Sequence, residues 1–333
     1  MKRFVFTCGD INGIGPEIAL KSLNRITAKN KNSEFILVIP KNVFKSTTKL
    51  IEPTFKYQIT DNTKSLVQIE EQVKILLTKP FRQDIGKPTL SSGKAAFLVL
   101  KTAFTIIKNN IADAVVTTPV SKTALNFAGV KYPGQTEMFA DWSKAKNFVM
   151  TFLSDKLRVA LYSIHIPLKK VSNTLKIKEF GNKLDILINM LKIDLSVKNP
   201  TIAVLGLNPH AGENGIIGRE EIELLGQVIR SKKYEGVVEG PFSADAYFAN
   251  RKFNEFDMTF GIYHDQVLIP FKYINSGMGV NYTAGLDIIR TSPDHGTAYD
   301  IAGKGIASET SMIEAFRYAE LILKNRKRNL VSK

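Results

Sequence analysis

Cysteine is almost missing from this 333-residue chain, in which Cys8 is the only one. A single cysteine excludes an internal disulfide framework, a four-cysteine zinc site and a cysteine-ligated iron–sulfur cluster within one chain. The chain also has no run of about 18 consecutive apolar residues, and the apolar stretch at its start is too short for a signal peptide. We therefore expect a protein of the reducing cytoplasm without a transmembrane helix.

Acidic residues are few relative to basic ones, and the formal net charge is +15. Such a charge invites a nucleic-acid interpretation. The lysines are scattered along the chain, however, and even the densest basic cluster, residues 324–328, is not interleaved with aromatic residues as in many nucleic-acid binders. We interpret the excess as a solvated surface, whose positive field would favour an anionic, for example phosphorylated, small substrate.

Strand-like and helix-like segments alternate along the chain, and this repetition indicates an α/β protein with a largely parallel sheet. The length suggests two domains. In the predicted helix over 219–230, Ile222, Leu225 and Ile229 share one face. The predicted strands are 4–7, 35–39, 113–118, 158–164, 201–207 and 258–263, and the other predicted helices start at Pro16 or cover about 93–109, 178–192 and 308–324.

Histidine is also scarce, and three of the four histidines follow predicted strands. These are His165, His210 and His264. Ligands of open α/β sheets bind beyond the carboxyl ends of strands, and three imidazoles can hold a divalent cation that keeps positions open for substrate. A histidine at a strand end is otherwise an ordinary hydrogen-bonded loop residue, and the spacings form no local metal motif. The residues alone therefore leave a metal site and ordinary loop histidines both open.

Two glycine-rich segments are less informative by themselves. Residues 9–17 lie between a predicted strand and a predicted helix, where backbone amides could hold an anion. Their glycines follow neither the dinucleotide-binding spacing nor the P-loop spacing, which excludes a conventional Rossmann site. Residues 295–307 predict only a surface loop before the last helix.

Nine motifs in one order give the chain a wider resemblance. They resemble the 4-hydroxythreonine-4-phosphate dehydrogenase family of pyridoxal phosphate biosynthesis, with its close paralogues, over nearly the whole chain. The last motif is also similar to the nucleotide-binding loop of isocitrate and isopropylmalate dehydrogenases, whose cofactor site is not a Rossmann site. The motifs are Gly9–Glu17, Pro119–Lys122, Tyr132–Glu137, Leu205–Glu213, Gly218–Glu221, Gly240–Pro241 with Ala244–Asp245, Tyr263–Gln266, Gly279–Asn281, and Ile289–Ser292 with Asp294–Ala298.

The resemblance implies two α/β/α domains around a cleft, as in isocitrate and isopropylmalate dehydrogenases. A cofactor-side domain would comprise 1–127 plus 270–333, and a metal, substrate and dimerisation domain would comprise 128–269. It further implies a homodimer in which both subunits contribute the three histidines that hold one divalent metal. Those histidines match His165, His210 and His264. Neither nucleic acid nor a membrane is an expected partner.

The resemblance also assigns substrate-binding residues, and one of them departs from the family. Gln135 stands where the family usually has a substrate-contacting histidine. Glutamine can donate a hydrogen bond but cannot carry charge or shuttle a proton, which bears on substrate identity or rate. The other substrate-binding residues match Thr136, Lys272, Asn281 and Arg290.

The cofactor-binding segment of the family matches His295, Gly296, Thr297 and Ala298. Asp245 and Lys272 are the candidate catalytic residues, Asp245 either as a proton acceptor or as the partner of a metal-ligating histidine. NAD and NADP both stay open, although Asp300 would repel the additional phosphate of NADP if it points inward. Zinc, cobalt, manganese and magnesium also stay open, although three imidazoles favour the later transition metals.

The reaction implied is an NAD(P)- and metal-dependent oxidation of 4-phosphooxy-L-threonine to 2-amino-3-oxo-4-phosphooxybutanoate. This product would decarboxylate to 3-amino-1-hydroxyacetone phosphate, a precursor of pyridoxine 5′-phosphate. One alternative is a paralogue that oxidises 4-phospho-threonate or 4-phospho-erythronate, and Gln135 is the feature that favours it. A rival of another class is a non-catalytic phosphate-ligand sensor or nucleic-acid binder, which needs neither a metal triad nor a cofactor loop.

Overall fold

The computed structural model describes residues 1–331, which form two compact units. The first unit comprises Met1–Lys144 and Asp287–Leu323, and the second comprises Ala145–Leu286 and the segment from Lys324. Both contain strands and helices in alternation, as predicted. The sequence placed the domain changes near residues 127 and 270. The packing places them after helix α5 (Gln135–Trp142) and after strand β11 (Val280–Ala284).

The sheet of the first unit is parallel throughout, in the order β3-β4-β2-β1-β5-β12. Its central strands are buried on both faces, which is why they read as continuous apolar runs in the sequence. The strands are β1 (Lys2–Thr7), β2 (Ser33–Pro40), β3 (Tyr57–Thr60), β4 (Val73–Thr78), β5 (Ala114–Val116) and β12 (Ile289–Pro293).

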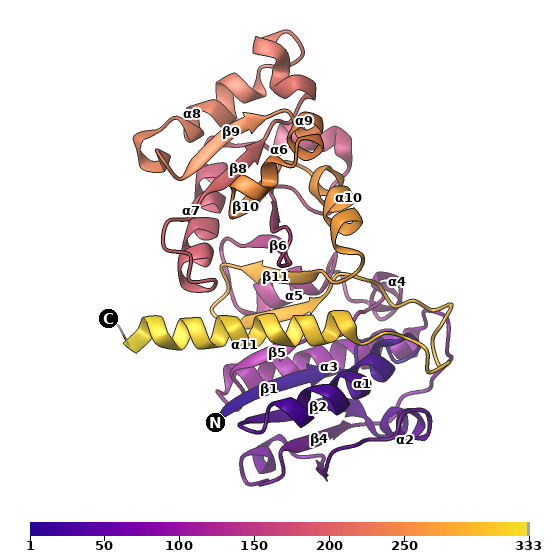
Figure 1. Ribbon diagram of the computed structural model, residues 1–333. Helices are drawn as coiled ribbons and strands as arrows, with labels where there is room; N and C mark the ends of the chain where they lie inside the picture. Colours follow the sequence, from indigo (N-terminus) through magenta and orange to yellow (C-terminus); the bar gives the residue numbers. More distant parts are fainter. Residues whose placement is uncertain (332–333) are drawn as a thin grey trace. The chain divides into compact units, whose positions relative to one another are not determined.

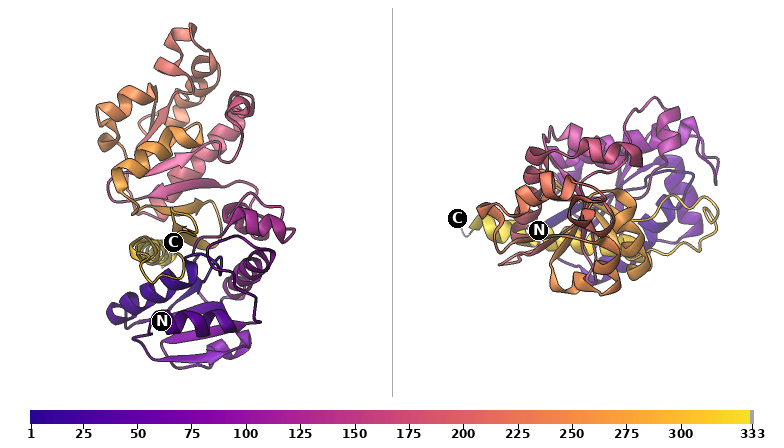
Figure 2. Two further views of the ribbon diagram at one scale, coloured as in Figure 1. Left: turned by 90° about the vertical axis from the view of Figure 1, so that its right-hand side faces the viewer. Right: turned by 90° about the horizontal axis from the view of Figure 1, so that it is seen from above.

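Helices cover both faces of this sheet (Figures 1 and 2). Helices α1 (Gly15–Lys29) and α2 (Lys41–Leu50) pack on one face, and α3 (Leu90–Lys108) packs on the other. Helix α1 has Pro16 in its first turn, and its predicted apolar face of Ala19, Leu23 and Ile26 is buried. Helix α4 (Lys122–Phe127) packs beside α3, and α11 (Thr310–Val331) ends the described chain.

Helix α3 is the helix among residues 1–331 that is long and apolar enough to cross a membrane by length and composition. In the structure it packs against β1, β2 and β5, and ten of its residues are buried. Its first turn is closed by a capping box between Thr89 and Ser92. These contacts are those of a core helix of an α/β unit.

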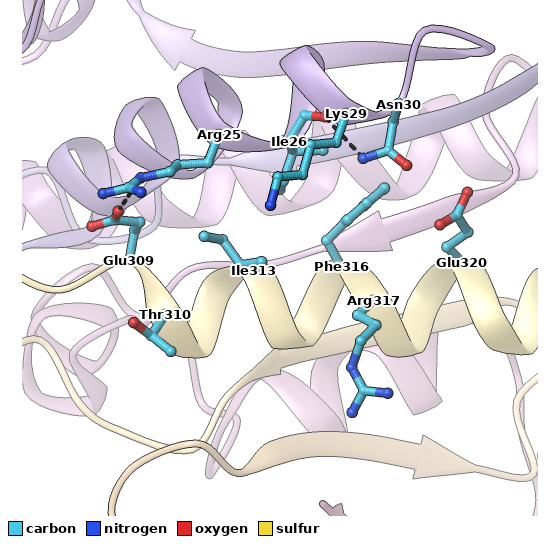
Figure 3. A pocket seen from close by; sticks show the side chains of 10 residues that line it. All are labelled: Arg25, Ile26, Lys29, Asn30, Glu309, Thr310, Ile313, Phe316, Arg317 and Glu320. Carbon is cyan, nitrogen blue, oxygen red and sulfur yellow. Dashed lines mark hydrogen bonds and ion pairs between the residues drawn. The ribbon is translucent and has the colours of Figure 1, made fainter. Parts of the chain in front are cut away.

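A groove of about 480 Å³ lies between α1 and α11 in the first unit (Figure 3). Ile26, Ile313 and Phe316 form its apolar lining, and Phe316 also packs edge-on against Phe4 of β1. An ion pair of 3.0 Å joins Arg25 of α1 to Glu309, the residue immediately before α11. None of the predicted site residues lines this groove.

The sheet of the second unit is mixed, in the order β11-β6-β7-β10-β8-β9. The pairs β11·β6 and β6·β7 are antiparallel, and the pairs β7·β10, β10·β8 and β8·β9 are parallel. The remaining strands are β6 (Val149–Leu153), β7 (Val159–Leu161), β8 (Ile202–Leu205), β9 (Val238–Phe242) and β10 (Met258–Gly261).

The second unit has its own core on both faces of the sheet. Helix α10 (His264–Asn275) places Val267, Leu268 and Phe271 against β7 and its neighbours, together with Tyr247 of α9 (Ala244–Ala249). On the other face, Phe180 of α7 (Ile177–Ile193) stacks on Phe260 of β10 with ring centroids 5.2 Å apart. Helices α7 and α10 lie on opposite sides of these strands in Figure 1.

The end of α11 belongs to the second unit and makes a largely buried ionic contact with it. Arg326 donates through Nε to Asp194 at 2.7 Å, and Tyr282 of β11 donates to the same carboxylate. Asp194 and Tyr282 are buried. Arg326 lies inside the basic cluster 324–328, so part of that cluster has a structural role rather than forming a solvated surface.

The predicted helix over 219–230 differs in the structure. It begins with a π-helical turn at Glu221–Leu225 and continues as the short helix α8 (Gly226–Ile229). Leu225 and Ile229 are buried, whereas Ile222 is 40% exposed. The wider i→i+5 turn rotates Ile222 away from the other two side chains, so the predicted common face of these three residues is wrong.

Candidate active site

Adjacent strands bring two of the predicted histidines together in the second unit. β7 and β10 pair in parallel, and the pairing continues through backbone bonds from Tyr162 to Gly261 and from Ser163 to Ile262. His165 follows β7, and His264 begins α10 directly after β10. Their ring centroids lie 6.0 Å apart. The ends of two adjacent parallel strands therefore place these two imidazoles close together.

Both imidazoles line a cavity of about 310 Å³ that also contains Ile166, Leu168 and Asp265 in its wall. The Asp265 carboxylate accepts a hydrogen bond of 2.6 Å from Nδ1 of His264. A carboxylate on one ring nitrogen fixes the imidazole and leaves Nε2 as the nitrogen for a metal.

His210 is presented by a left-handed turn that follows β8. Residues 210–214 have φ angles between 43° and 83°, and four of these five residues are not glycine. The left-handed region costs a non-glycine residue about 1–2 kcal/mol. A run of such residues is kept only where surrounding contacts hold it, and such runs concentrate at functional sites.

His210 is not part of the His165–His264 pair. Within residues 1–331, no group of three or more His, Cys, Asp or Glu side chains is placed to hold a metal ion. The charged neighbour of His210 is Asp245. The Ser243 hydroxyl and the Ala246 N–H lower the pKa of Asp245, and His210 adds a smaller effect in the same direction. One chain therefore brings together two of the three predicted ligands.

The other predicted residues of the second unit lie on α10 and β11. Lys272 is exposed on α10, two turns after His264. Asn281 is buried in β11, where it stands opposite Phe152 of the antiparallel neighbour β6. Strand β11 was not predicted, because its residues alternate apolar and polar side chains without a continuous apolar run.

The first unit places Arg290 and Thr136 in contact. Arg290 lies on β12 and is only 2% exposed. Its Nε and Nη2 donate to the Thr117 hydroxyl at 3.1 and 3.0 Å, and its Nη1 donates to the Thr136 hydroxyl at 3.3 Å. Burial lowers the pKa of the guanidinium to about 10, and the negative charge of Glu137 opposes this effect. Arg290 is thus a buried cation at neutral pH.

Gln135 begins helix α5 immediately before Thr136. Its Nε2 donates to the Thr118 carbonyl at 3.0 Å. Its Oε1 is buried without a hydrogen-bond partner in the described chain. A buried acceptor without a donor costs free energy, so the amide oxygen is suited to a ligand that brings an N–H or O–H group.

The predicted cofactor segment packs against the first glycine-rich segment. The Ile14 N–H donates to the Thr297 carbonyl at 3.0 Å, and a Cβ on Gly13 would lie 2.7 Å from that same oxygen. Asp10 is buried and accepts from the Tyr299 hydroxyl at 2.8 Å, and burial raises the pKa of the Asp10 carboxyl. Gly296 has open space where a Cβ would stand, so a ligand can approach its backbone.

Sequence reasoning missed the residues that hold this loop. Buried Glu17 accepts from the backbone N–H groups of Gly305 and Ala307, at 3.2 and 2.8 Å. Lys21 donates to the carbonyls of the same two residues at 2.8 Å. The presence of two glycine-rich segments in one chain was the available signal that they pack together, since neither segment was informative by itself.

Comparisons with known proteins identify the family of the chain. Residues 31–319 match the family model described as "Pyridoxal phosphate biosynthetic protein PdxA". A 4-hydroxythreonine-4-phosphate dehydrogenase of Sulfurihydrogenibium sp. is 36% identical over 332 residues, covering 98% of this chain and 100% of the relative. A putative D-threonate 4-phosphate dehydrogenase of Oceanobacillus iheyensis is also 36% identical, over 94% of this chain and 95% of the relative.

Solved structures give the same result. The crystal structure of 4-hydroxythreonine-4-phosphate dehydrogenase from Klebsiella pneumoniae is 32% identical and covers 97% of this chain and 100% of its own, with a TM-score of 0.81. Isocitrate dehydrogenase from Methylococcus capsulatus, 14% identical with a TM-score of 0.50 and covering 98% of this chain and 87% of its own, shares the fold alone. The predicted isocitrate dehydrogenase-like α/β fold is confirmed. The chain belongs to the PdxA family of pyridoxal phosphate biosynthetic proteins.

Proposed function

We propose that this protein is an NAD(P)- and divalent-metal-dependent dehydrogenase of 4-phosphooxy-L-threonine. It oxidises the C3 hydroxyl to give 2-amino-3-oxo-4-phosphooxybutanoate, which decarboxylates to 3-amino-1-hydroxyacetone phosphate for pyridoxine 5′-phosphate synthesis. The observation that carries the proposal is the pair of imidazoles, His165 and His264, in one cavity of a PdxA-family chain. The single, buried cysteine, Cys8, supports a cytoplasmic location.

The donor set fits a divalent metal. His165 and His264 would be two ligands, with Asp265 orienting the second, and His210 of the partner subunit would be the third. A bound divalent cation would lower the pKa of an alcohol and stabilise negative charge on oxygen. Zinc, cobalt, manganese and magnesium are the candidates, of which three imidazoles favour the later transition metals.

Exposed apolar side chains in the cavity wall and on α10 support a homodimer. Leu168 is 69% exposed, and Ile269 and Tyr273 on α10 are 66% and 87% exposed. Exposed apolar clusters of this kind are typical of protein interfaces. A second copy of the chain would cover these side chains, and its left-handed turn would bring the third histidine ligand to the cavity.

The other site residues bind the substrate. Arg290 offers a planar fork of donors and Lys272 a compact point charge, and both suit a phosphate or carboxylate. Thr136, already in contact with Arg290, offers a hydroxyl, and the buried amide of Asn281 would orient a substrate oxygen. The Gln135 amide oxygen would accept from a substrate N–H or O–H group.

The cofactor segment His295–Ala298 would hold the nicotinamide dinucleotide through its backbone. Asp10, which accepts from Tyr299, and Gly13, which lies against the Thr297 carbonyl, would hold this segment in place. NAD and NADP both remain candidates, and Asp300 is exposed. Asp245 would accept a proton or orient His210, and Lys272 is the second candidate catalytic residue. A metal-ion site, a cofactor loop and buried substrate-binding groups together favour catalysis over a phosphate-ligand sensor or a nucleic-acid binder.

The proposal is tested by following absorbance at the NADH band with 4-phosphooxy-L-threonine and either NAD⁺ or NADP⁺. We expect nicotinamide reduction that a chelator abolishes and that one of the four metals restores. A protein that reduces neither cofactor with any phosphorylated hydroxy acid, whatever metal is added, would be a binder rather than this enzyme.

A second candidate function is oxidation of 4-phospho-threonate or 4-phospho-erythronate, which carry a hydroxyl in place of the amine. The 36% identity to a putative D-threonate 4-phosphate dehydrogenase favours it, and the departure of Gln135 from the family's usual histidine keeps it open. In the same assay we expect kcat/KM to be about tenfold higher for the amine, because a charged donor gains more from the Gln135 oxygen than a neutral one does. An equal or higher value for either sugar acid would establish the second function.

A further inference from the structure

Asn208, two residues before His210, holds the start of the left-handed turn through hydrogen bonds to Glu221. The Asn208 backbone N–H donates to Glu221 Oε1 at 2.7 Å, and the Asn208 side-chain Nδ2 donates to Glu221 Oε2 at 3.0 Å. Glu221 is 3% exposed, so both oxygens of a buried carboxylate are committed to one residue. A buried carboxylate with two such bonds fixes its partner more firmly than a neutral acceptor does.

A second carboxylate adds to this arrangement. Glu220 accepts from Asn208 Nδ2 at 2.9 Å and, through its other oxygen, from the Ser172 hydroxyl at 2.6 Å. Ser172 lies in the short helix α6 (Val171–Thr174), which follows His165 in the chain. The entrance to the His210 turn is therefore bonded both to the π-helical turn of Glu221 and to the segment after His165.

The turn itself packs against the Glu221 carboxylate. A Cβ on Gly212 would stand 2.6 Å from Glu221 Oε2, and a Cβ on Gly206 would stand 2.8 Å from the Ala211 Cα. Glycine at these positions lets the left-handed turn approach the acid closely. The turn therefore packs directly on the Glu221 carboxylate, although Glu221 is not a candidate metal ligand itself.

We propose that Glu221 is a positioning residue which, through Asn208, holds His210 in the conformation in which it binds the metal, and that it thereby sets metal affinity. This inference rests on the proposed function in one respect, the assignment of His210 as a metal ligand. The strained backbone of residues 210–214 would otherwise relax toward the right-handed region and carry the imidazole away.

The test compares Glu221→Gln with Glu223→Gln in metal-free protein titrated with Co²⁺, followed by the visible absorption of the bound ion. Glutamine keeps the shape of Glu221 but turns an NH₂ group toward the donors of Asn208. Glu223 lies in the same turn and is exposed, paired with Arg219. We expect Glu221→Gln to weaken Co²⁺ binding about 10–100-fold and Glu223→Gln to leave it unchanged.

A double-substitution cycle separates positioning through Asn208 from a general loss of structure. Once Asn208→Ala has removed the side-chain bond, adding Glu221→Gln should weaken Co²⁺ binding far less than it does in the wild-type protein. Equal Co²⁺ affinity of the Glu221→Gln and Glu223→Gln proteins, or full additivity in the cycle, would overturn the inference.

Amide hydrogen exchange in the metal-free proteins makes the result independent of the proposed function. If the wild-type protein binds no Co²⁺, the metal assignment fails, and exchange of residues 208–214 still decides on the positioning role. Faster exchange there in Glu221→Gln than in Glu223→Gln would support it. Indistinguishable exchange would contradict it.

Discussion

Replacement of His210 by alanine is expected to lower kcat/KM by at least about 1,000-fold and to remove most of the bound metal. His210 is the third imidazole of the proposed site, and two imidazoles alone leave a divalent cation weakly held. The fold should survive, because the predicted change concerns one side chain on a turn whose contacts run through Asn208 and Glu221. Metal content is measured by elemental analysis and turnover by the NADH assay.

Two further variants make this prediction specific. His210→Asn removes the imidazole but keeps a residue that tolerates the left-handed region, so it should lose metal without strain in the turn. His295→Ala removes the histidine outside the proposed ligand set and should keep its metal. Retained metal and turnover in both His210 variants would refute the ligand assignment.

Replacement of Arg290 by methionine is expected to raise KM for the phosphorylated substrate about 100-fold, because a buried guanidinium can form two charge-assisted hydrogen bonds to an anion. Stability should change little or rise. Burial lowers the pKa of Arg290 to about 10, so the folded state binds this proton less tightly than the unfolded state does. The buried charge therefore costs stability at every pH below about 10, and methionine removes that cost.

Thermal unfolding and kinetics together distinguish the roles that Arg290 could have. An arginine with only a structural role would lose stability on substitution and leave KM unchanged. Arg317, half-buried on α11 and paired with Glu314, provides a control outside the proposed site, and Arg317→Met should leave KM unchanged. A lower melting temperature of Arg290→Met with an unaltered KM would contradict the substrate-binding role.

The strands that could be predicted from sequence were those with continuous apolar runs. β2, β7, β8 and β10 are buried on both faces and bounded by turn residues, so their pattern is strong. β11 and β12 are equally buried but carry polar side chains, among them Asn281 and Arg290, and were not recognised. In these strands the buried polar side chains interrupt the apolar pattern by which a buried strand is recognised.

The domain division and the π-helical turn show a second limit of prediction from the sequence. The last turns of α11 join the second unit because Arg326 reaches buried Asp194, more than a hundred residues away in sequence. The turn at Glu221–Leu225 is wider than an α-helix, which displaces Ile222 from the predicted face. Both features depend on tertiary contacts that a local pattern does not contain.

The candidate site was predictable to the extent that topology determines it. His165 and His264 meet because β7 and β10 are neighbours in the sheet. The conformation of His210 was not predictable, because four non-glycine residues in the left-handed region have no local signature. The roles of Asp10 and Glu221 were missed because each acts through hydrogen bonds to a partner outside its own segment, Tyr299 for Asp10 and Asn208 for Glu221.

The central claim is that three histidines of two subunits bind one metal ion, and subunit complementation tests it most directly. The variants His165→Ala, His210→Ala and His264→Ala are each inactive in the proposal. When two variants are combined in equal amounts and their subunits exchange at random, half of the dimers contain one subunit of each variant. Each proposed site takes some of its histidines from one subunit and the rest from the other. A mixed dimer therefore regains one intact site only if the two substituted histidines are normally contributed to a site by different subunits.

The account predicts that His210→Ala recovers about a quarter of wild-type activity when mixed with either His165→Ala or His264→Ala. The mixture of His165→Ala with His264→Ala should stay inactive, because these two imidazoles lie 6.0 Å apart in one chain. Inactivity of all three mixtures, in protein shown to exchange subunits, would contradict the shared metal site.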